Sequence, residues 1–192
     1  MFQQLRRVVL FTGIAVSAFL VGCAGPAPNY APSIDNVEAL KNKAAGASVK
    51  TGVIGVKPGM PGASTMTLRA NSMTSPVGAH YGDYLAAALR QELEMAKLYN
   101  PQAGVEITGT LLTNNINAGG IGTNEGQIEA RFIVTANGQV RFDKVKQIER
   151  KWESSFAAAV AIPLAANNYP LMVQSLVGAL VTDPDFIKAI RN

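Results

Sequence analysis

Cysteine chemistry is the first chemistry that the sequence offers, because the chain of 192 residues contains a single cysteine, Cys23. Cys23 follows an apolar stretch from Val8 to Val21, and Arg6 and Arg7 carry the only charges among the first 22 residues. The stretch is too short to span a bilayer comfortably, and a basic start followed by a short apolar run is typical of a secretory signal peptide. The sequence therefore predicts a signal peptide over residues 1–22.

The end of this segment, Leu20-Val21-Gly22-Cys23, resembles the bacterial lipobox, in which a dedicated peptidase cuts before a cysteine whose thiol is acylated. The resemblance implies that Cys23 becomes the first residue of the mature chain and carries acyl chains such as palmitate. Several acyl chains make a stable anchor, since each buried methylene contributes about 0.8 kcal/mol. An ordinary signal peptide beside a buried free cysteine, or a membrane anchor that is never cut, is the alternative.

The residue after the cysteine influences sorting in such lipoproteins, where an aspartate favours retention in the inner membrane. This chain has Ala24 at that position. The resemblance therefore implies the inner leaflet of the outer membrane, with the domain facing the periplasm. With Cys23 acylated, no thiol is left for a disulfide, a metal or nucleophilic catalysis.

Other residues give little indication of catalysis. His80 is the only histidine and lies three residues before Asp83, so a general base with its orienting carboxylate is conceivable; Ser72 and Ser75 would be the nearest nucleophiles in sequence. A histidine on the surface at the start of a helix is the simpler interpretation. One histidine and one acylated cysteine do not supply the usual ligands of zinc, so we expect neither a metal nor a cofactor.

Two further patterns could suggest a reaction but favour a structural interpretation. Glu92 and Glu94 are two residues apart on a predicted helix, so their carboxylates point in different directions and cannot act as an acid/base pair. The glycines of the loop 119–122 lack the lysine and the following helix of a phosphate-binding loop. We therefore expect a protein that is not an enzyme.

Length and charge predict one secreted domain. Removal of residues 1–22 leaves enough chain for a single hydrophobic core and a net charge of +2, with acidic and basic residues interspersed. No cluster of lysine and arginine with interleaved aromatic residues is present, so no nucleic-acid partner is expected. Residues 23–48 are rich in alanine and proline and predict a flexible tether, followed by an α+β domain over residues 49–192.

Periodicity predicts the elements of this domain. Residues 49–56 and 65–70 read as two strands of a hairpin, joined by the turn-rich sequence KPGMPGAS. Apolar residues at helical spacing predict a helix over about 79–98. Strands are expected from Val105 towards Asn117, around residues 128–134, and from Gln139 to about Phe156. Asn137-Gly138 predicts a tight hairpin turn between the last two.

The segment 156–181 contains no charged residue. A membrane span is disfavoured by the prolines and asparagines in its middle. We expect a helix that starts with Asn168 as its cap and Pro170 in its first turn, with a short last helix after Asp183-Pro184. The predicted fold is a two-layer α+β sandwich: a mainly antiparallel sheet of four to five strands with two amphipathic helices on one face.

The back of this C-terminal helix is uncharged and formed by small or neutral side chains, whereas a solvated face would carry lysine or glutamate. Uncharged exposed surface often belongs to an interface. The candidate interface consists of Leu171, Gln174, Ser175, Gly178 and Ala179. It would dock a partner protein or a second copy, unless residues before 156 cover it.

The lipobox, the helix YGDYLAAALRQELEMAKLY, the strand VEITGTLLTNNINA, the hairpin EARFIVTANGQVRFDK and the closing TDPDFIKAI together resemble the YajG family of small bacterial envelope lipoproteins. Similar helix-on-sheet folds occur in the lipopolysaccharide-assembly plug, in activators of peptidoglycan synthases and in auxiliary components of lipid-trafficking transporters. The resemblance implies a non-catalytic binding or adaptor module in the envelope, anchored through Cys23. The alternative is a lipid- or glycolipid-binding accessory protein with a groove lined by the C-terminal helix and the sheet.

Overall fold

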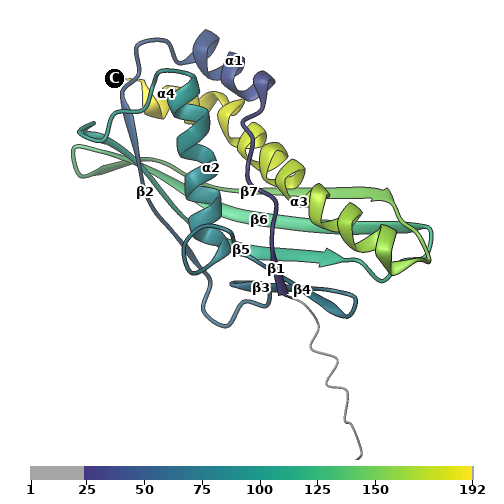
Figure 1. Ribbon diagram of the computed structural model, residues 1–192. Helices are drawn as coiled ribbons and strands as arrows, with labels where there is room; N and C mark the ends of the chain where they lie inside the picture. The colour runs from purple at the N-terminus through teal and green to yellow at the C-terminus, as the bar shows by residue number, and fades with distance from the viewer. Residues whose placement is uncertain (1–23, 192) are drawn as a thin grey trace, which may run out of the picture.

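A four-stranded sheet forms the centre of the computed structural model, which describes residues 24–191 (Figure 1). Its strands are β2 (Val49–Val56), β5 (Val105–Asn117), β6 (Thr123–Ala136) and β7 (Gln139–Glu153), in the order β2-β5-β6-β7. β2 runs parallel to β5, and the other two pairs are antiparallel. A smaller sheet has the order β1-β4-β3, with β1 (Ala24–Pro26), β3 (Thr65–Leu68) and β4 (Asn71–Thr74).

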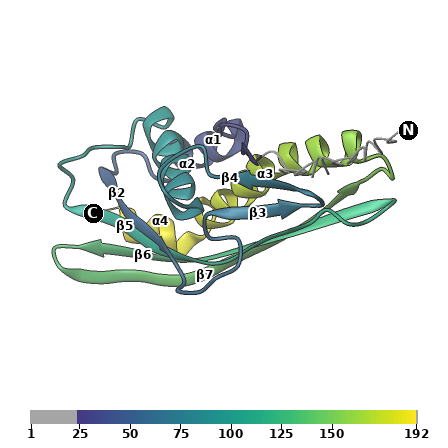
Figure 2. The same cartoon turned by 60° about the horizontal axis from the view of Figure 1, so that its bottom comes forward.

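The helices lie on one face of the main sheet, and its opposite face is left open (Figures 1 and 2). They are α1 (Ile34–Lys43), α2 (Tyr81–Met95), α3 (Ala158–Val181) and α4 (Pro184–Ile190). This arrangement of a helical layer on a mainly antiparallel sheet confirms the predicted α+β fold class. The described chain contains four helices and a second small sheet, whereas the sequence analysis expected one sheet, two amphipathic helices on its face and a short last helix.

The long hairpin of β6 and β7 follows the sequence pattern closely. Ile128, Ala130, Phe132 and Val134 alternate along β6 and are fully buried, as expected for a strand with one face on the core. The turn at Asn137 and Gly138 has φ angles of 52° and 77°, which is the left-handed conformation that a two-residue hairpin turn needs. The predicted hairpin is therefore confirmed.

The predicted flexible tether over residues 23–48 is wrong for the part that the structure describes. β1 pairs with β4, α1 has Ser33 as its N-cap, and Tyr30 and Leu40 are buried in the core. The alanines and prolines of this segment suggested a linker, but a few large side chains bury enough surface to hold it against α2 and α3. The described fold thus includes residues 24–48 as well as the predicted domain from residue 49.

The predicted hairpin of residues 49–56 and 65–70 is also wrong. β2 pairs with β5 instead, and β3 pairs with β4, a strand that the sequence analysis missed. Arg69 adopts a left-handed conformation with φ 58° and forms the tight turn between β3 and β4 with Ala70. The pattern of residues 71–74 was too short to indicate a strand.

Helix α3 begins ten residues earlier than expected, at Ala158 and not near Asn168. Both Pro163 and Pro170 lie inside the helix, where each removes one backbone hydrogen bond. The helix continues because Ala161 and Ala165 extend the buried face that carries Tyr169. No helix in the described part of the chain is long and apolar enough to cross a membrane.

The main sheet has two open strand edges besides the outer edge of β2, where the described residues form a bridge at Val49 with Tyr99. The pairing of β2 with β5 ends at Leu111, so the second half of β5 pairs only with β6. β7 is the last strand in the sheet order, and eight of its 15 residues are charged. The half-open edge of β5 faces the smaller sheet and forms a cleft, which is described below.

Candidate functional site

The predicted lipidation signal lies at the boundary of the structure. Leu20, Val21, Gly22 and Cys23 are outside the described residues, so their predicted roles in recognition and acylation stay predictions. Ala24, the predicted sorting residue, is the first residue of β1 and pairs with Ser72 of β4. The described fold therefore includes the residue that follows the predicted acylated cysteine in the sequence.

The candidate interface on α3 is partly used inside the molecule. The Gln174 amide donates to the Ala31 carbonyl at 2.7 Å, and the Gln174 carbonyl accepts from the Asn36 amide at 3.0 Å. A Cβ atom on Gly178 would lie 2.8 Å from the Asn36 side chain. The N-terminal segment thus covers Gln174 and Gly178, which was the alternative left open. Of the other three residues, Leu171 and Ser175 are exposed and Ala179 is half-buried.

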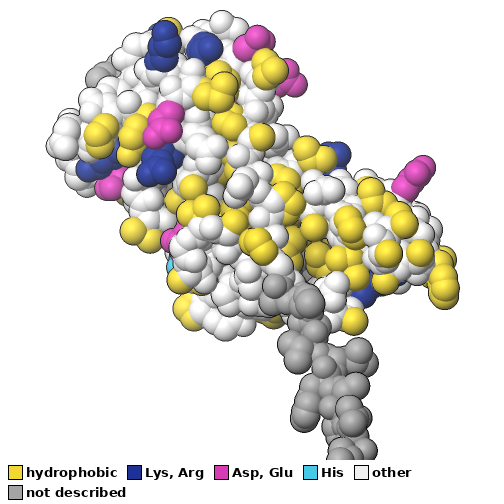
Figure 3. Space-filling view, viewed as in Figure 1, with side chains coloured by type: hydrophobic (Ala, Val, Ile, Leu, Met, Phe, Trp, Pro, Cys, Tyr) yellow, Lys and Arg dark blue, Asp and Glu magenta, His cyan; other side chains and the backbone are white. Residues whose placement is uncertain are grey.

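The first half of α3 carries exposed apolar side chains instead. Phe156, just before the helix, is 82% exposed, and Val160 and Leu164 are 49% and 38% exposed. Figure 3 shows apolar side chains gathered over this part of α3. The sequence analysis missed this surface, because it placed the start of the helix after these residues.

Arg69 holds three segments together beside this surface. Its guanidinium donates to the carbonyls of Ala118 at 2.8 Å and Gly120 at 3.0 Å in the loop between β5 and β6. It also donates to the carbonyls of Ser155 at 2.6 Å and Phe156 at 2.9 Å before α3. The β3–β4 turn, the β5–β6 loop and the start of α3 therefore lie at one end of the molecule (Figure 2).

A cleft of about 440 Å³ lies between β3 and the half of β5 that has no partner on that side. Its apolar walls come from Met60, Met66 and Ile116, and its polar walls from threonines and asparagines of the two strands. Asn114 closes its inner side, since the Asn114 amide donates to the Gly62 carbonyl at 2.9 Å. The volume falls in the range of ordinary ligand and peptide sites.

Glu92 lies in a buried polar cluster that the sequence analysis did not find. Its carboxylate accepts hydrogen bonds from the Tyr30 hydroxyl, from the Ser33 N–H at 2.9 Å and from the Asn36 amide at 3.2 Å. Burial and the neighbouring Glu92 carboxylate raise the pKa of Tyr30 well above its usual value, so Tyr30 stays a donor. The signal in the sequence was a glutamate within the apolar stripe of α2.

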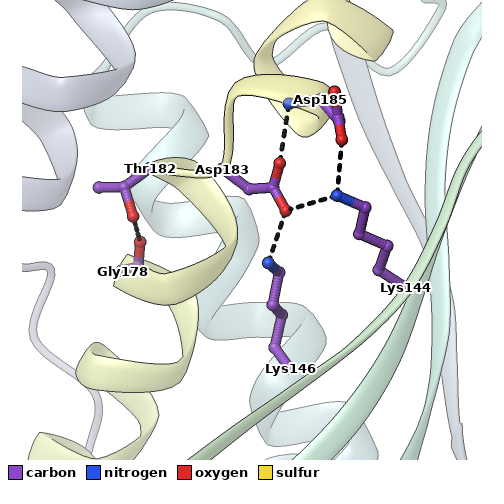
Figure 4. A network of polar contacts seen from close by, with 6 residues as sticks. All are labelled: Lys144, Lys146, Gly178, Thr182, Asp183 and Asp185. Carbon is purple, nitrogen blue, oxygen red and sulfur yellow. Dashed lines mark hydrogen bonds and ion pairs between the residues drawn. The ribbon is translucent and has the colours of Figure 1, made fainter.

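A second polar cluster attaches α4 to β7 (Figure 4). Asp183 caps α4 by accepting from the Asp185 N–H at 2.7 Å, and it accepts from Lys146 Nζ at 2.6 Å and Lys144 Nζ at 3.2 Å. Burial raises the pKa of Asp183, but the hydrogen bonds from Lys146, the Asp185 N–H and Lys144 outweigh it and hold the pKa well below its usual value. The cap on Asp183-Pro184 confirms the predicted last helix.

His80 is the N-cap of α2. Its Nδ1 lies 3.3 Å from Asp83 Oδ2, and the same carboxylate accepts from the His80 and Ala79 N–H groups. This is a capping box, which satisfies the first backbone donors of the helix. Among residues 24–191, no group of three or more histidine, cysteine, aspartate or glutamate residues is placed to hold a metal ion.

The apolar side chains expected to line a lipid groove are packed in the core. Tyr169, Met172 and Leu176 of α3 have no exposed surface and lie against the sheet and α2. The Tyr169 ring centroid is 4.9 Å from that of Tyr81 and 5.4 Å from that of Tyr84. These side chains are therefore not available to line an open groove.

Comparison with family models found no match, and comparison with curated proteins found no relative. Several solved structures are similar. XCC0632 from Xanthomonas campestris, described with the family model DUF330, has a TM-score of 0.58 at 9% identity, over 86% of this chain and 96% of that one. This likeness shows the fold.

Two further structures have TM-scores below 0.5. The protein CT253 from Chlamydia trachomatis has 0.48 at 8% identity, over 74% of this chain and 98% of that one. The rare lipoprotein B from Shewanella oneidensis has 0.34 at 16% identity, over 54% and 81%. A bacterial lipoprotein is thus among the similar structures. The YajG family is not named by these three, and membership in it stays a prediction.

Proposed function

We propose that this chain is an envelope lipoprotein, held on the inner leaflet of the outer membrane by acylated Cys23, whose periplasmic domain is a non-catalytic adaptor. The domain binds an extended segment of another envelope protein in the cleft between β3 and β5. The observation that carries this proposal is the open edge of β5 beyond Leu111, next to that cleft.

An open strand edge presents backbone N–H and C=O groups that an added strand can pair with. In peptide recognition by strand addition, these backbone hydrogen bonds give affinity, and pockets for alternate side chains give selectivity. Here the half-buried Leu112 offers an apolar contact beside the edge, and the exposed Thr65 and Asn115 offer polar ones. The edge lies on a rigid sheet, since β5 pairs with β6 along its whole length.

The lipid-binding alternative has less support. The side chains of α3 that would line an acyl groove are buried against the sheet, and the cleft has many threonine and asparagine side chains on its walls. An enzymatic role has little support as well, because the only histidine serves as a helix cap.

Photocrosslinking in cells tests the adaptor proposal. A photoreactive residue at Thr67 or Asn115, both exposed in the cleft, should capture the same envelope protein. Ser175 on α3 is the matched control, since it is exposed and lies outside the cleft. Asn115→Arg should abolish capture from Thr67, because a long charged side chain fills the cleft. Capture that is equal from Ser175, or unaffected by Asn115→Arg, would contradict a site in the cleft.

A further inference from the structure

One end of the domain exposes large apolar side chains from two separate segments. Ile121 in the β5–β6 loop is 69% exposed, and Phe156, Val160 and Leu164 at the start of α3 are 82%, 49% and 38% exposed. We call these four residues the apolar end. Arg69 fixes the two segments relative to each other through the carbonyls of Gly120 and Phe156.

The apolar end is also free of charge over long stretches of chain. No charged residue occurs from Ser154 to Thr182 or from Ala118 to Asn124. The nearby charge of Arg69 is taken up by four carbonyl groups. Charged residues lie at the border of the apolar end, where Glu153 is exposed and Lys151 pairs with Glu125. The four residues of the apolar end carry no charge themselves, so this part of the surface is suited to an apolar environment.

The first residue that the structure describes, Ala24, lies beside the β3–β4 turn that Arg69 joins to this end. Ala24 pairs with Ser72, which follows the β3–β4 turn, and the turn residue Arg69 donates to the Phe156 carbonyl. Cys23 directly precedes Ala24 in the sequence, and consecutive Cα atoms are about 3.8 Å apart. Figure 2 shows the turn and the start of α3 at one end of the molecule. In the sequence, the predicted acylated residue directly precedes the first residue of β1.

We propose that the apolar end inserts into the interface of the lipid leaflet that holds the acyl chains of Cys23. The proposal rests on the acylation of Cys23, which is part of the proposed function. Apolar and aromatic side chains next to a lipid anchor add a second point of attachment to the bilayer. The long β6–β7 hairpin then points away from the membrane, and its turn at Asn137 lies on the order of 45 Å from the end of β7.

The test uses the full-length lipidated protein in vesicles of phosphatidylethanolamine and phosphatidylglycerol. Because acylation blocks Cys23, an introduced cysteine is the one thiol that a fluorophore can label. Phe156→Cys places the label in the apolar end, and Val140→Cys is the matched control, since Val140 is apolar, 62% exposed and near the opposite end of β7. Lipids with a nitroxide on the acyl chain quench a label that enters the leaflet.

Quenching at position 156 should exceed that at position 140 several-fold. With the label at Ile121→Cys, the added change Phe156→Glu should lower quenching, and Val140→Glu should not. Equal quenching at 156 and 140 would overturn the proposal. A label at 156 that is shielded from water but not quenched by lipid would also overturn it, because a protein or a second copy would then cover this end.

The mass of the purified protein separates this proposal from the proposed function. An acylated protein without quenching at position 156 refutes membrane insertion and leaves the adaptor role intact. A protein without acyl chains on Cys23 refutes both the anchor and the insertion. Loss of capture from Thr67 and Asn115 with quenching intact refutes the adaptor site alone.

Discussion

Replacement of Arg69 is the sharpest test of how the end of the domain next to Ala24 is held together. Arg69→Ala removes four hydrogen bonds to backbone carbonyls. Each such bond contributes about 1 kcal/mol net, and some of the freed carbonyls can bind water instead. We therefore expect the free energy of unfolding to fall by about 2–4 kcal/mol, which for a domain of this size lowers the Tm by roughly 4–16 °C.

The backbone of Arg69 gives a second, independent measurement. Its φ of 58° costs a residue with a Cβ atom about 1–2 kcal/mol, a cost that glycine does not have. Part of this gain is offset by the greater freedom of glycine in the unfolded chain. Arg69→Gly should therefore destabilise the protein by about 1 kcal/mol less than Arg69→Ala, although both variants lose the same hydrogen bonds.

Denaturant unfolding measures these differences, and amide hydrogen exchange reports where they act. Exchange should rise in the loop 118–122 and at the start of α3, and stay unchanged at the Asn137-Gly138 turn. Arg150→Ala is the matched control, because the Arg150 side chain donates to Asn168 alone at 3.0 Å and should cost about 1 kcal/mol or less. The reasoning would be refuted if Arg69→Ala lowered the free energy of unfolding no more than Arg150→Ala, or if Arg69→Gly lowered it more than Arg69→Ala.

Three further predictions concern the core and the C-terminal helix. Tyr30→Phe should cost about 1.5–3 kcal/mol of unfolding free energy, because the Tyr30 hydroxyl donates to the buried side chain of Glu92. Tyr84→Phe loses a bond to the Pro28 backbone carbonyl and should cost about 0.5–1.5 kcal/mol, and equal costs would contradict a stronger bond to Glu92. Gly82→Ala should lower the free energy of unfolding by about 3 kcal/mol or more, because the new Cβ would lie 2.2 Å from the Ile54 carbonyl oxygen. Gly55→Ala is the control, since the space around its Cβ is open, and denaturant unfolding measures both variants. The pKa of Asp183 is lowered in the folded protein, so its stabilising contribution is present above the usual aspartate pKa of about 3.9 and is lost as the pH falls below it towards the folded value. Asp183→Asn should therefore lose less stability in acid than the parent protein. Asp185→Asn is the control and should not reproduce this difference.

Local patterns predicted much of the main sheet. The alternation of apolar residues located β5 at its observed bounds, and Asn137-Gly138 located the hairpin between β6 and β7. Each of these patterns is formed by residues that are close together in the sequence, so it can be recognised without the structure. The aspartate and proline before α4 are a signal of the same kind.

The errors come from contacts between distant parts of the chain. Pro163 and Pro170 read as signs of a loop and a helix start, but burial of α3 against the sheet outweighs the two lost backbone bonds. Tyr30 meets Glu92, 62 residues further along, and this contact turns a linker-like segment into part of the core. Arg69 likewise reaches segments about 50 and 86 residues away, which no local pattern indicates.

The candidate site was predicted only in part, because it also depends on contacts between distant parts of the chain. The uncharged character of residues 156–181 was evident in the sequence, but which side of α3 is free depends on the position of α1. The cleft depends on where the pairing of β2 with β5 stops, and this register is set by tertiary packing. Neither feature is encoded in a short motif.

The charged edge strand β7 has a consequence for how copies of this protein meet. A strand of 15 residues at the border of a sheet is a template for cross-β aggregation between molecules. The five basic and three acidic residues of β7 oppose parallel, in-register growth, because a second β7 in that register would place each charge beside its like. If Cys23 anchors the protein as proposed, copies concentrated on one membrane are thereby protected against edge-to-edge fibre formation, and the proposed strand addition is left to the shorter, uncharged edge of β5.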